Sequence, residues 1–308
     1  MTKQRGAAAN DTLVIEETTN FDGFEVSYNY SIVDGSETPP LVLLGGAFQT
    51  ARSWAPFNAV FANRKPVLSI ELPGSPGSPP LPRDSDFSWL AACVIHVLDE
   101  LRIDQVDVLA FSYAGPIGFY VGSQYPRRVR RLTLGGTTGA FTAAVEQTVR
   151  LSVEYAAQGE REYFASLSIG VGLTNINPKI KIRRQQAITR MLWRQLTTLT
   201  DQDVENYIEN SMRILAASET FASRPRPQCF TLGFTGQYDT LTPPGDSQDF
   251  ILSFPNAVFT TVLATDHLCL FEDPRTTVAL ADTFFTDQTP KQLPDCTPYR
   301  YSIPQPVT

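Results

Sequence analysis

The stretch Ala-Phe-Ser-Tyr-Ala-Gly, centred on Ser112, constrains the fold of this chain more than any other. Residues 106–110 form an apolar, partly β-branched run typical of a buried strand, and residues 115–125 have the apolar spacing of a helix. The chain must turn between them within very few residues, so small side chains are needed around the turn. Ala110 and Ala114 provide them, and Ala-x-Ser-x-Ala is a relaxed form of the elbow that lifts a nucleophilic serine above a parallel sheet.

Short apolar runs that predict buried strands alternate with amphipathic runs that predict helices. An Asp-Gly pair between residues 12–16 and 24–30 also predicts a hairpin. Strands that alternate with helices imply an α/β fold, a mostly parallel twisted sheet with helices on both faces. The predicted strands are 41–44, 66–70, 106–110, 129–134, 230–236 and 258–263, and the predicted helices around them are 53–62, 86–101, 115–125 and 276–285.

The character of the sequence changes in the middle of the chain. Residues 149–164, 180–199 and 203–217 are rich in helix formers with repeating apolar positions, and no strand pattern interrupts them. We therefore expect a helical cap inserted into an α/β core, followed by a Pro-rich tail. The expected divisions are 12–136 and 229–286 for the two parts of the core, 137–228 for the cap and 287–308 for the tail.

Composition and charge exclude several classes of protein. The 308 residues, 42% of them hydrophobic, can bury a large core. A net charge of -7 argues against a nucleic-acid partner. No apolar run approaches the roughly 20 residues of a membrane span, so we expect a soluble cytoplasmic protein without a membrane partner. The cysteines lack Cys-x-x-Cys spacing, so we expect reduced thiols and no metal or other cofactor; they are Cys93, Cys229, Cys269 and Cys296.

A serine nucleophile needs a neutral imidazole within hydrogen-bond reach. The chain has two histidines. His96 lies inside the predicted helix 86–101 between apolar neighbours, as is typical of a residue at a packing boundary. His267 follows the last predicted strand of the sheet, where a site at the carboxyl ends of the strands needs its base. We predict His267 as the general base; a surface loop residue is the alternative.

The carboxylate that orients the histidine should come before it in the chain. Asp239 follows the predicted strand 230–236, and Thr-Pro-Pro then ends the turn and begins a helix. Asp266 adjoins His267 and is badly placed to reach its ring. Two further candidates, Asp246 and Asp249, fall on the helix after the turn. We predict Asp239 as the acid.

An oxyanion hole needs two backbone N–H groups aimed at one point. Tyr113, which follows the nucleophile, supplies one of them. The other comes from the loop after the strand 41–44, where Gly45 and Gly46 let the backbone approach closely. Ala47 is the predicted donor, and Phe48 is next in line.

The motifs around these residues resemble the α/β-hydrolase fold family over roughly residues 12–286. Many family members have His-Gly where this chain has Gly45-Gly46, and glycine where it has Ala110 and Ala114. The motifs are Gly-Gly-Ala-Phe (45–48), Glu-Leu-Pro-Gly-Ser-Pro-Gly-Ser (71–78), Ala-Phe-Ser-Tyr-Ala-Gly (110–115), Gly-Gln-Tyr-Asp-Thr-Leu-Thr-Pro (236–243) and Asp-His-Leu-Cys-Leu-Phe-Glu (266–272).

The resemblance implies a serine acyl hydrolase that cleaves an ester or thioester with an apolar acyl group through an acyl-enzyme. More narrowly, Thr50-Ala51 and Asp239-x-x-Thr242 are similar to the acyltransferase of rhamnolipid biosynthesis. That similarity leaves open an acyltransferase that moves a 3-hydroxyacyl group from carrier protein or coenzyme A to a hydroxyl acceptor. A catalytically idle binding protein with the same fold is the third alternative.

Substrate should bind between the cap and the carboxyl ends of the strands. Phe48, Phe141 and Trp193 are the predicted contacts, with cap core as the alternative. Six basic residues within residues 179–194 predict either a solvated helix face or a dock for an acyl carrier protein or coenzyme A. They are Lys179, Lys181, Arg183, Arg184, Arg190 and Arg194.

Overall fold

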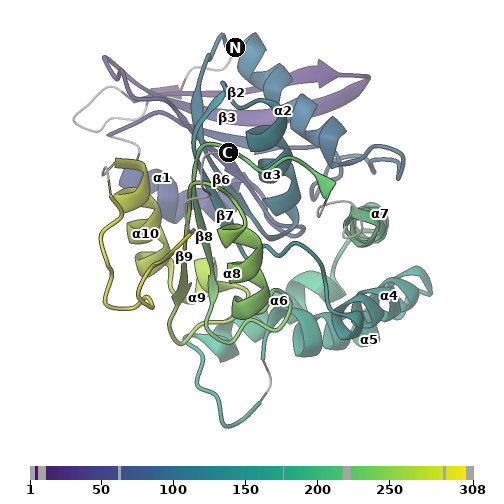
Figure 1. Ribbon diagram of the computed structural model, residues 1–308. Coiled ribbons are helices and arrows are strands. Elements are labelled where there is room, and N and C mark those ends of the chain that lie inside the picture. Colours follow the sequence, from purple (N-terminus) through teal and green to yellow (C-terminus); the bar gives the residue numbers. More distant parts are fainter. Residues whose placement is uncertain are drawn as a thin grey trace.

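The computed structural model describes residues 4–5, 12–61, 64–175, 177–217, 223–286 and 289–302. Its strands are β1 (Gln4–Arg5), β2 (Thr12–Phe21), β3 (Phe24–Val33), β4 (Leu41–Leu44), β5 (Val67–Glu71), β6 (Val106–Phe111), β7 (Val129–Gly135), β8 (Phe230–Gly236), β9 (Ala257–Val262) and β10 (Arg300–Tyr301). They form one sheet in the order β1-β2-β3-β5-β4-β6-β7-β8-β9-β10 (Figure 1). The strands from β5 to β9 in this order are parallel, and antiparallel strands extend both ends.

Helices cover both faces of this sheet, which confirms the predicted fold class. The helices α2, α3 and α8 pack on one face, and α1 and α10 pack on the other (Figure 1). The described helices are η1 (Ala51–Trp54), α1 (Ala55–Phe61), α2 (Phe87–Glu100), η2 (Ser112–Ala114), α3 (Gly115–Gln124), α4 (Ala143–Ala157), α5 (Arg161–Leu167), η3 (Ser168–Leu173, a π-helix), α6 (Gln185–Thr197), α7 (Asp201–Ala217), α8 (Pro244–Leu252), α9 (Cys269–Glu272) and α10 (Pro274–Thr286).

Strand β4 shows why a continuous apolar run suits the middle of such a sheet. Successive side chains of a strand point to opposite faces. Val42 and Leu44 accordingly pack with the helices on one face, and Leu41 and Leu43 pack with those on the other. Since both faces are buried, every residue of the strand is apolar.

Several predicted element bounds are wrong. The predicted helix 149–164 is two helices, because the chain turns at Gly159 with φ +76° between α4 and α5. The predicted helix 53–62 begins earlier than expected, because Ser53 lies inside η1, whose N-cap is Thr50. The predicted helix 180–199 begins only at Gln185. Part of the expected tail forms β10 against β9, so it extends the sheet as well as crossing the surface.

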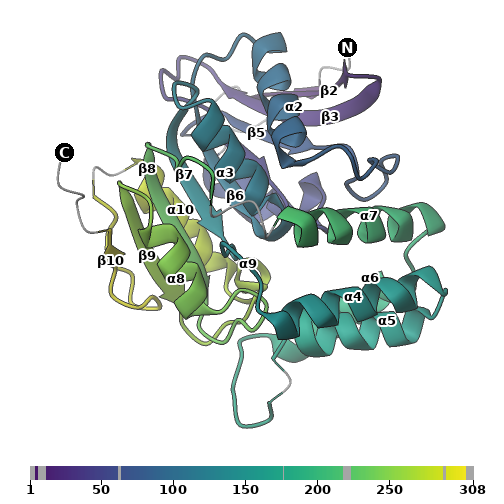
Figure 2. The ribbon, with the colours of Figure 1, turned by 45° about the vertical axis from the view of Figure 1, so that its right-hand side comes forward.

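The helices α4 to α7 lie within the expected cap segment 137–228. The helix α4 packs against α5 and α7, and α5 packs against α6 (Figure 2). Their shared apolar core includes Phe164, Leu192 and Leu196. None of the described helices is both long and apolar enough to cross a membrane.

Candidate active site

Ser112 stands on a sharp turn between β6 and α3. Its backbone has φ +55°, the left-handed region that costs free energy for a residue other than glycine. The turn holds because α3 packs closely on the sheet. A Cβ atom added at Gly118 of α3 would lie 2.6 Å from the Cβ of Ala110. A larger residue at position 110 would push the helix away, which explains the small side chain before the turn.

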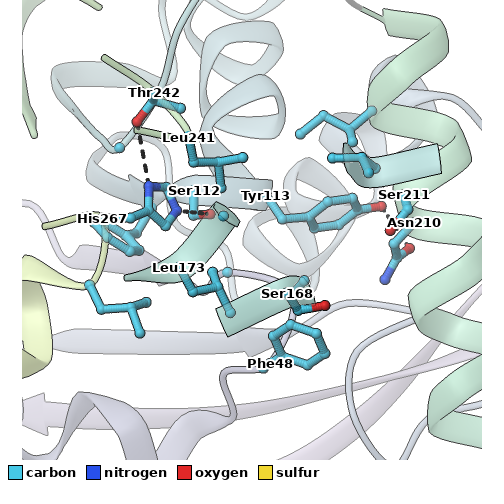
Figure 3. Close-up of a pocket in the computed structure, with 18 of the residues that line it drawn as sticks. Phe48, Ser112, Tyr113, Ser168, Leu173, Asn210, Ser211, Leu241, Thr242 and His267 are labelled. Carbon is cyan, nitrogen blue, oxygen red and sulfur yellow. Dashed lines mark hydrogen bonds between the residues drawn. The ribbon is translucent and has the colours of Figure 1, made fainter. Parts of the chain in front are cut away.

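Ser112, His267 and Asp239 are connected by two hydrogen bonds. The Oγ atom of Ser112 lies 2.8 Å from Nε2 of His267, and Nδ1 of His267 lies 2.9 Å from Oδ2 of Asp239. Figure 3 shows His267 between Ser112 and Thr242. His267 and Asp239 are almost completely buried. The structure thus brings the three predicted catalytic side chains together in the order that proton transfer needs.

Asp239 is held by hydrogen bonds to both of its carboxylate oxygens. Oδ1 accepts from the backbone N–H groups of Leu241 and Thr242 at 2.9 and 2.8 Å. Oδ2 accepts from the hydroxyl of Thr242 at 2.7 Å and from that of Thr235. Burial raises the pKa of Asp239, but attraction to His267 and these hydrogen bonds outweigh it, so the pKa lies below its ordinary value. Asp239 is therefore ionised at neutral pH.

Ionised Asp239 favours the charged form of His267. Burial lowers the pKa of His267, but the charge of Asp239 and its hydrogen bond raise it more, so the pKa lies above its ordinary 6.5. A histidine in this setting can take a proton from Ser112 and hold it. The sequence did not reveal the hydroxyls of Thr235 and Thr242 that complete this arrangement.

Asp266 does not compete for the histidine ring. Its Oδ1 accepts from the backbone N–H of His267 at 2.7 Å, and its Oδ2 accepts from the backbone N–H of Asn175. Burial, followed by repulsion from Asp239, raises the pKa of Asp266 to about 7. The close approach of this loop also explains Gly236, where an added Cβ would lie only 2.0 Å from the carbonyl oxygen of Asp266.

The two predicted oxyanion donors line the same cavity as Ser112 and His267. They are Ala47, after β4, and Tyr113, after the nucleophile. A Cβ at Gly46 would lie 3.2 Å from the Cβ of Ser112, so the glycine loop does approach the nucleophile. Gln49, which sequence reasoning missed, holds that loop: its Oε1 accepts from the N–H of Gly46 at 2.6 Å.

A cavity of about 310 Å³ opens above Ser112, a size suited to a small molecule. Its lining is mostly apolar and includes the predicted contacts Phe48 and Phe141. The structure does not bring Trp193 to it, since Met191, Leu192 and Gln195 of α6 line the cavity and Trp193 is 40% exposed. Among the described lining residues there is no Lys, Arg, Asp or Glu.

One face of α7 presents a row of polar side chains, here called the polar stripe, toward the Pro-rich loop 72–86. Asp203 accepts from the backbone of this loop, and Asn206 and Asn210 donate to its carbonyls. Arg213 is 4% exposed and donates to the carbonyls of three loop residues. These carbonyls belong to Leu81, Pro82 and Ser85, at 2.8, 2.9 and 2.6 Å.

The polar stripe also reaches the nucleophile elbow. Arg213 donates to the hydroxyl of Tyr113 at 2.9 Å, and that hydroxyl donates to Oδ1 of Asn210 at 2.8 Å. Arg213 and Asn210 are themselves bonded at 2.7 Å. The residue after Ser112 is thereby tied to α7 through two buried side chains, an arrangement that the sequence did not indicate.

The basic residues of segment 179–194 are not all available to a partner. Arg183 forms ion pairs with Asp273 and with Asp295, and Arg184 donates to the carbonyl of Phe271 at 2.7 Å. These contacts attach the segment to the region after His267. The other four basic residues are exposed, and a docking role for them stays a prediction; they are Lys179, Lys181, Arg190 and Arg194.

Two further polar sites have structural roles. The Nε2 atom of His96 lies 3.2 Å from the hydroxyl of Thr19, far along the sheet from Ser112. Asp107 on β6 is completely buried and pairs with Lys65, itself 3% exposed, and with Arg130. The four cysteines are free, and the described residues contain no cluster suited to a metal ion.

Residues 39–274 match the family model described as alpha/beta hydrolase fold, and this match covers more than half of the chain. The chain therefore belongs to the α/β-hydrolase fold family. It is 36% identical over 120 residues to the uncharacterized hydrolase YcgS of Bacillus subtilis (strain 168), covering 38% of this chain and 40% of that protein. It is 31% identical over 106 residues to 2-hydroxymuconate semialdehyde hydrolase of Pseudomonas sp. (strain CF600), covering 32% and 37%.

The chain thus spans about two fifths of the length of these relatives. Among solved structures, the enol-lactonase from Burkholderia xenovorans LB400 matches with a TM-score of 0.73 at 17% identity, over 88% of this chain and 100% of that one. That likeness shows the fold. Both of these relatives are named as hydrolases.

Proposed function

We propose that the protein is a serine acyl hydrolase that cleaves an ester or thioester with an apolar acyl group. The observation that carries this proposal is the chain of hydrogen bonds from Ser112 through His267 to Asp239 at the base of a mostly apolar cavity. A strained serine, a buried imidazole and a buried carboxylate cost free energy, and ligand binding without catalysis does not require this geometry.

In the first half of the proposed reaction, Oγ of Ser112 attacks the carbonyl carbon and its proton passes to Nε2 of His267. The N–H groups of Ala47 and Tyr113 stabilise the negative charge that develops on the carbonyl oxygen. The tetrahedral intermediate then collapses, and its bond to the alcohol or thiol breaks. The leaving group takes the proton from His267, and the acyl group remains bound to Ser112.

In the second half, water attacks the acyl-enzyme and gives one proton to Nε2 of His267. Collapse of the second tetrahedral intermediate releases the acid and returns the proton to Oγ of Ser112. Asp239 stabilises the imidazolium in both halves and stays ionised, in keeping with its lowered pKa. The enzyme therefore ends in the state in which it began.

We propose that segment 137–228 acts as a cap that selects the substrate, because α4, η3, α6 and α7 all supply residues of the cavity lining. The named substrate of the Pseudomonas relative, a muconate semialdehyde, carries a carboxylate. A carboxylate in this cavity would meet no lysine or arginine among the described lining residues. The acyl group proposed to enter the cavity of this chain is therefore uncharged.

Replacing Ser112 by alanine tests the proposal. We expect kcat on para-nitrophenyl esters to fall by roughly a thousandfold or more, and a fluorophosphonate probe that labels the wild type should no longer react. Ser123→Ala is the control, since Ser123 lies on α3 away from the cavity and its hydroxyl donates to the carbonyl of Tyr120. Full activity in the Ser112→Ala variant would refute the mechanism.

The acceptor is tested by product analysis. With an acyl-coenzyme A, we expect free acid whether or not a 3-hydroxyacyl acceptor is added. Formation of an ester only when the acceptor is present would replace water by a hydroxyl group and make the enzyme an acyltransferase.

A further inference from the structure

Four hydroxyl groups gather where α4, η3 and α7 meet at the cavity. They belong to Ser152 on α4, Ser168 in η3, and Tyr207 and Ser211 on α7, and all four residues line the cavity. We call them the hydroxyl cluster. Figure 3 shows Ser168 and Ser211 on the side of the cavity away from His267. None of the four takes part in the proposed proton transfer.

The hydroxyl of Tyr207 is held in place. The Oγ of Ser152 donates to the carbonyl of Val149 at 2.7 Å, so it must accept the proton of the Tyr207 hydroxyl, which lies 2.5 Å away. The ring of Tyr207 stacks on Phe48 with centroids 5.5 Å apart and contacts Phe164 at 4.7 Å. The oxygen of Tyr207 therefore has a fixed position and a committed proton.

Ser168 is different because its hydroxyl has no partner. The residue is 8% exposed, and its Oγ makes no hydrogen bond with any described residue. It lies near enough to the Tyr207 hydroxyl to oppose the rise that burial causes in the pKa of Tyr207, but the two groups lack the distance and angle of a hydrogen bond. A buried hydroxyl without a partner costs free energy, so an oxygen donor left free beside a cavity points to a ligand.

The backbone at Ser168 has an unusual conformation. Ser168 begins the π-helix η3, in which the N–H of Thr174 donates to the carbonyl of Ile169 at 2.9 Å. Such wide turns are rare in proteins overall, and those that occur often lie at functional sites. They change the direction of the side chains that follow an α-helix, and here the change occurs after the end of α5, where Ser168 and Leu173 of η3 line the cavity.

We propose that the hydroxyl cluster is a second polar subsite that binds an uncharged oxygen of the substrate, an ether, hydroxyl or second carbonyl oxygen remote from the scissile carbonyl. This inference rests on the proposed function and specifies its substrate class. Ser168 donates a hydrogen bond to the substrate oxygen, and Ser211 lines the same side of the cavity. An apolar acyl ester with such an oxygen satisfies the free hydroxyl, whereas a plain hydrocarbon chain leaves it unpaired. A carboxylate would lack a counter-charge there.

The test compares esters of equal length. The kcat/KM of para-nitrophenyl hexanoate is measured beside analogues in which an ether oxygen replaces each inner methylene group of the acyl chain in turn, and beside an analogue that ends in a carboxylate. Alkyl hexanoates with an ether oxygen in the alcohol part cover the other side of the ester. We expect one oxygen position to raise kcat/KM by roughly tenfold and the carboxylate to lower it.

Variants of the hydroxyl cluster test whether it causes the expected rise in kcat/KM. In Ser168→Ala the ratio between the oxygenated ester and its hydrocarbon counterpart should fall to that of the uncatalysed esters, and Ser211→Ala should lower it too. Thr148→Val is the matched control: Thr148 also lines the cavity, but its hydroxyl already donates to the carbonyl of Ala144 at 2.9 Å, so the ratio should stay at the wild-type value.

The outcomes separate the two proposals. Ester hydrolysis that depends on Ser112 but shows no preference for any oxygen position overturns the subsite alone. A preference that survives in Ser168→Ala, or a preferred carboxylate, overturns it as well. Hydrolysis of all the esters by the Ser112→Ala variant overturns the proposed function. Calorimetry of the matched hydrocarbon and ether alkyl esters with the Ser112→Ala variant measures the oxygen preference without turnover, and equal affinities would again contradict the subsite.

Discussion

Replacing Arg213 by methionine tests whether α7 holds the nucleophile elbow in place. Arg213 is 4% exposed, and its guanidinium donates five hydrogen bonds, three to carbonyls of loop 72–86 and one each to Tyr113 and Asn210. Methionine keeps an apolar stem of similar length but has no donor. The substitution therefore removes all five bonds and leaves the apolar packing largely as it is.

The magnitude follows from what the acceptors lose. A hydrogen bond from a charged donor contributes about 1.5–3 kcal/mol, but removing a buried charge also removes its desolvation cost of several kcal/mol. Some of the loop carbonyls can also bond to water, because Pro82 is exposed. We expect the free energy of unfolding to fall by about 2–4 kcal/mol. The kcat should fall by roughly tenfold, because Tyr113 supplies a proposed oxyanion donor.

The assay is urea denaturation followed by steady-state kinetics under native conditions. Arg83→Met is the control, since Arg83 links the same loop to the same helix through Glu209 at 2.7 Å but has a side chain that is 58% exposed. Its loss should change stability far less. Equal losses in the two variants would refute the role of burial. An unchanged kcat in Arg213→Met would refute the coupling between α7 and the elbow.

Three further predictions follow from the site and its support. Asp239 raises the pKa of His267, and the reaction needs the neutral imidazole, so kcat/KM should be lost as pH falls through an apparent pKa above 6.5. The Asp239→Asn variant should have this inflection at a lower pH, and its kcat should be lower by roughly a thousandfold or more. Asp107→Ala should lower the free energy of unfolding by about 3–5 kcal/mol in urea, because Lys65 stays buried without its partner. Gly236→Ala should lower kcat by roughly tenfold or more at a moderate change in KM, because its Cβ would force back the loop that carries His267.

The sequence could predict that Ser112, Asp239 and His267 lie close together, because each follows a strand that is predicted by its own local apolar pattern. Parallel strands end at one edge of the sheet, so residues that follow β6, β8 and β9 are brought to that edge whatever the details of packing. Because the chain has two histidines, few combinations of a serine, a histidine and a carboxylate had to be considered. The catalytic role of the three residues stays a proposal for the variants above.

Contacts between distant segments could not be predicted in the same way. The pairing of Arg213 with loop 72–86 depends on how α7 lies against the core, which no local pattern encodes. The bend at Gly159 rotates α5 and α6 relative to a single long helix, and Trp193 consequently could not be assigned to the cavity or to the surface by its spacing. Ser168 gave no signal, because a lone serine in a helical segment is ordinary.

The bond between Tyr113 and Asn210 has a consequence for exchanging parts between relatives. A chimera with a foreign segment in place of residues 137–228 would have a new cavity lining. It would also lose Asn210, the hydrogen-bond partner of Tyr113 in the nucleophile elbow. Substrate preference and turnover would then change together, however well the graft folds. Designers who want only the preference to change should keep Asn206, Asn210 and Arg213 from this chain and exchange the residues that face the cavity from α4 and η3.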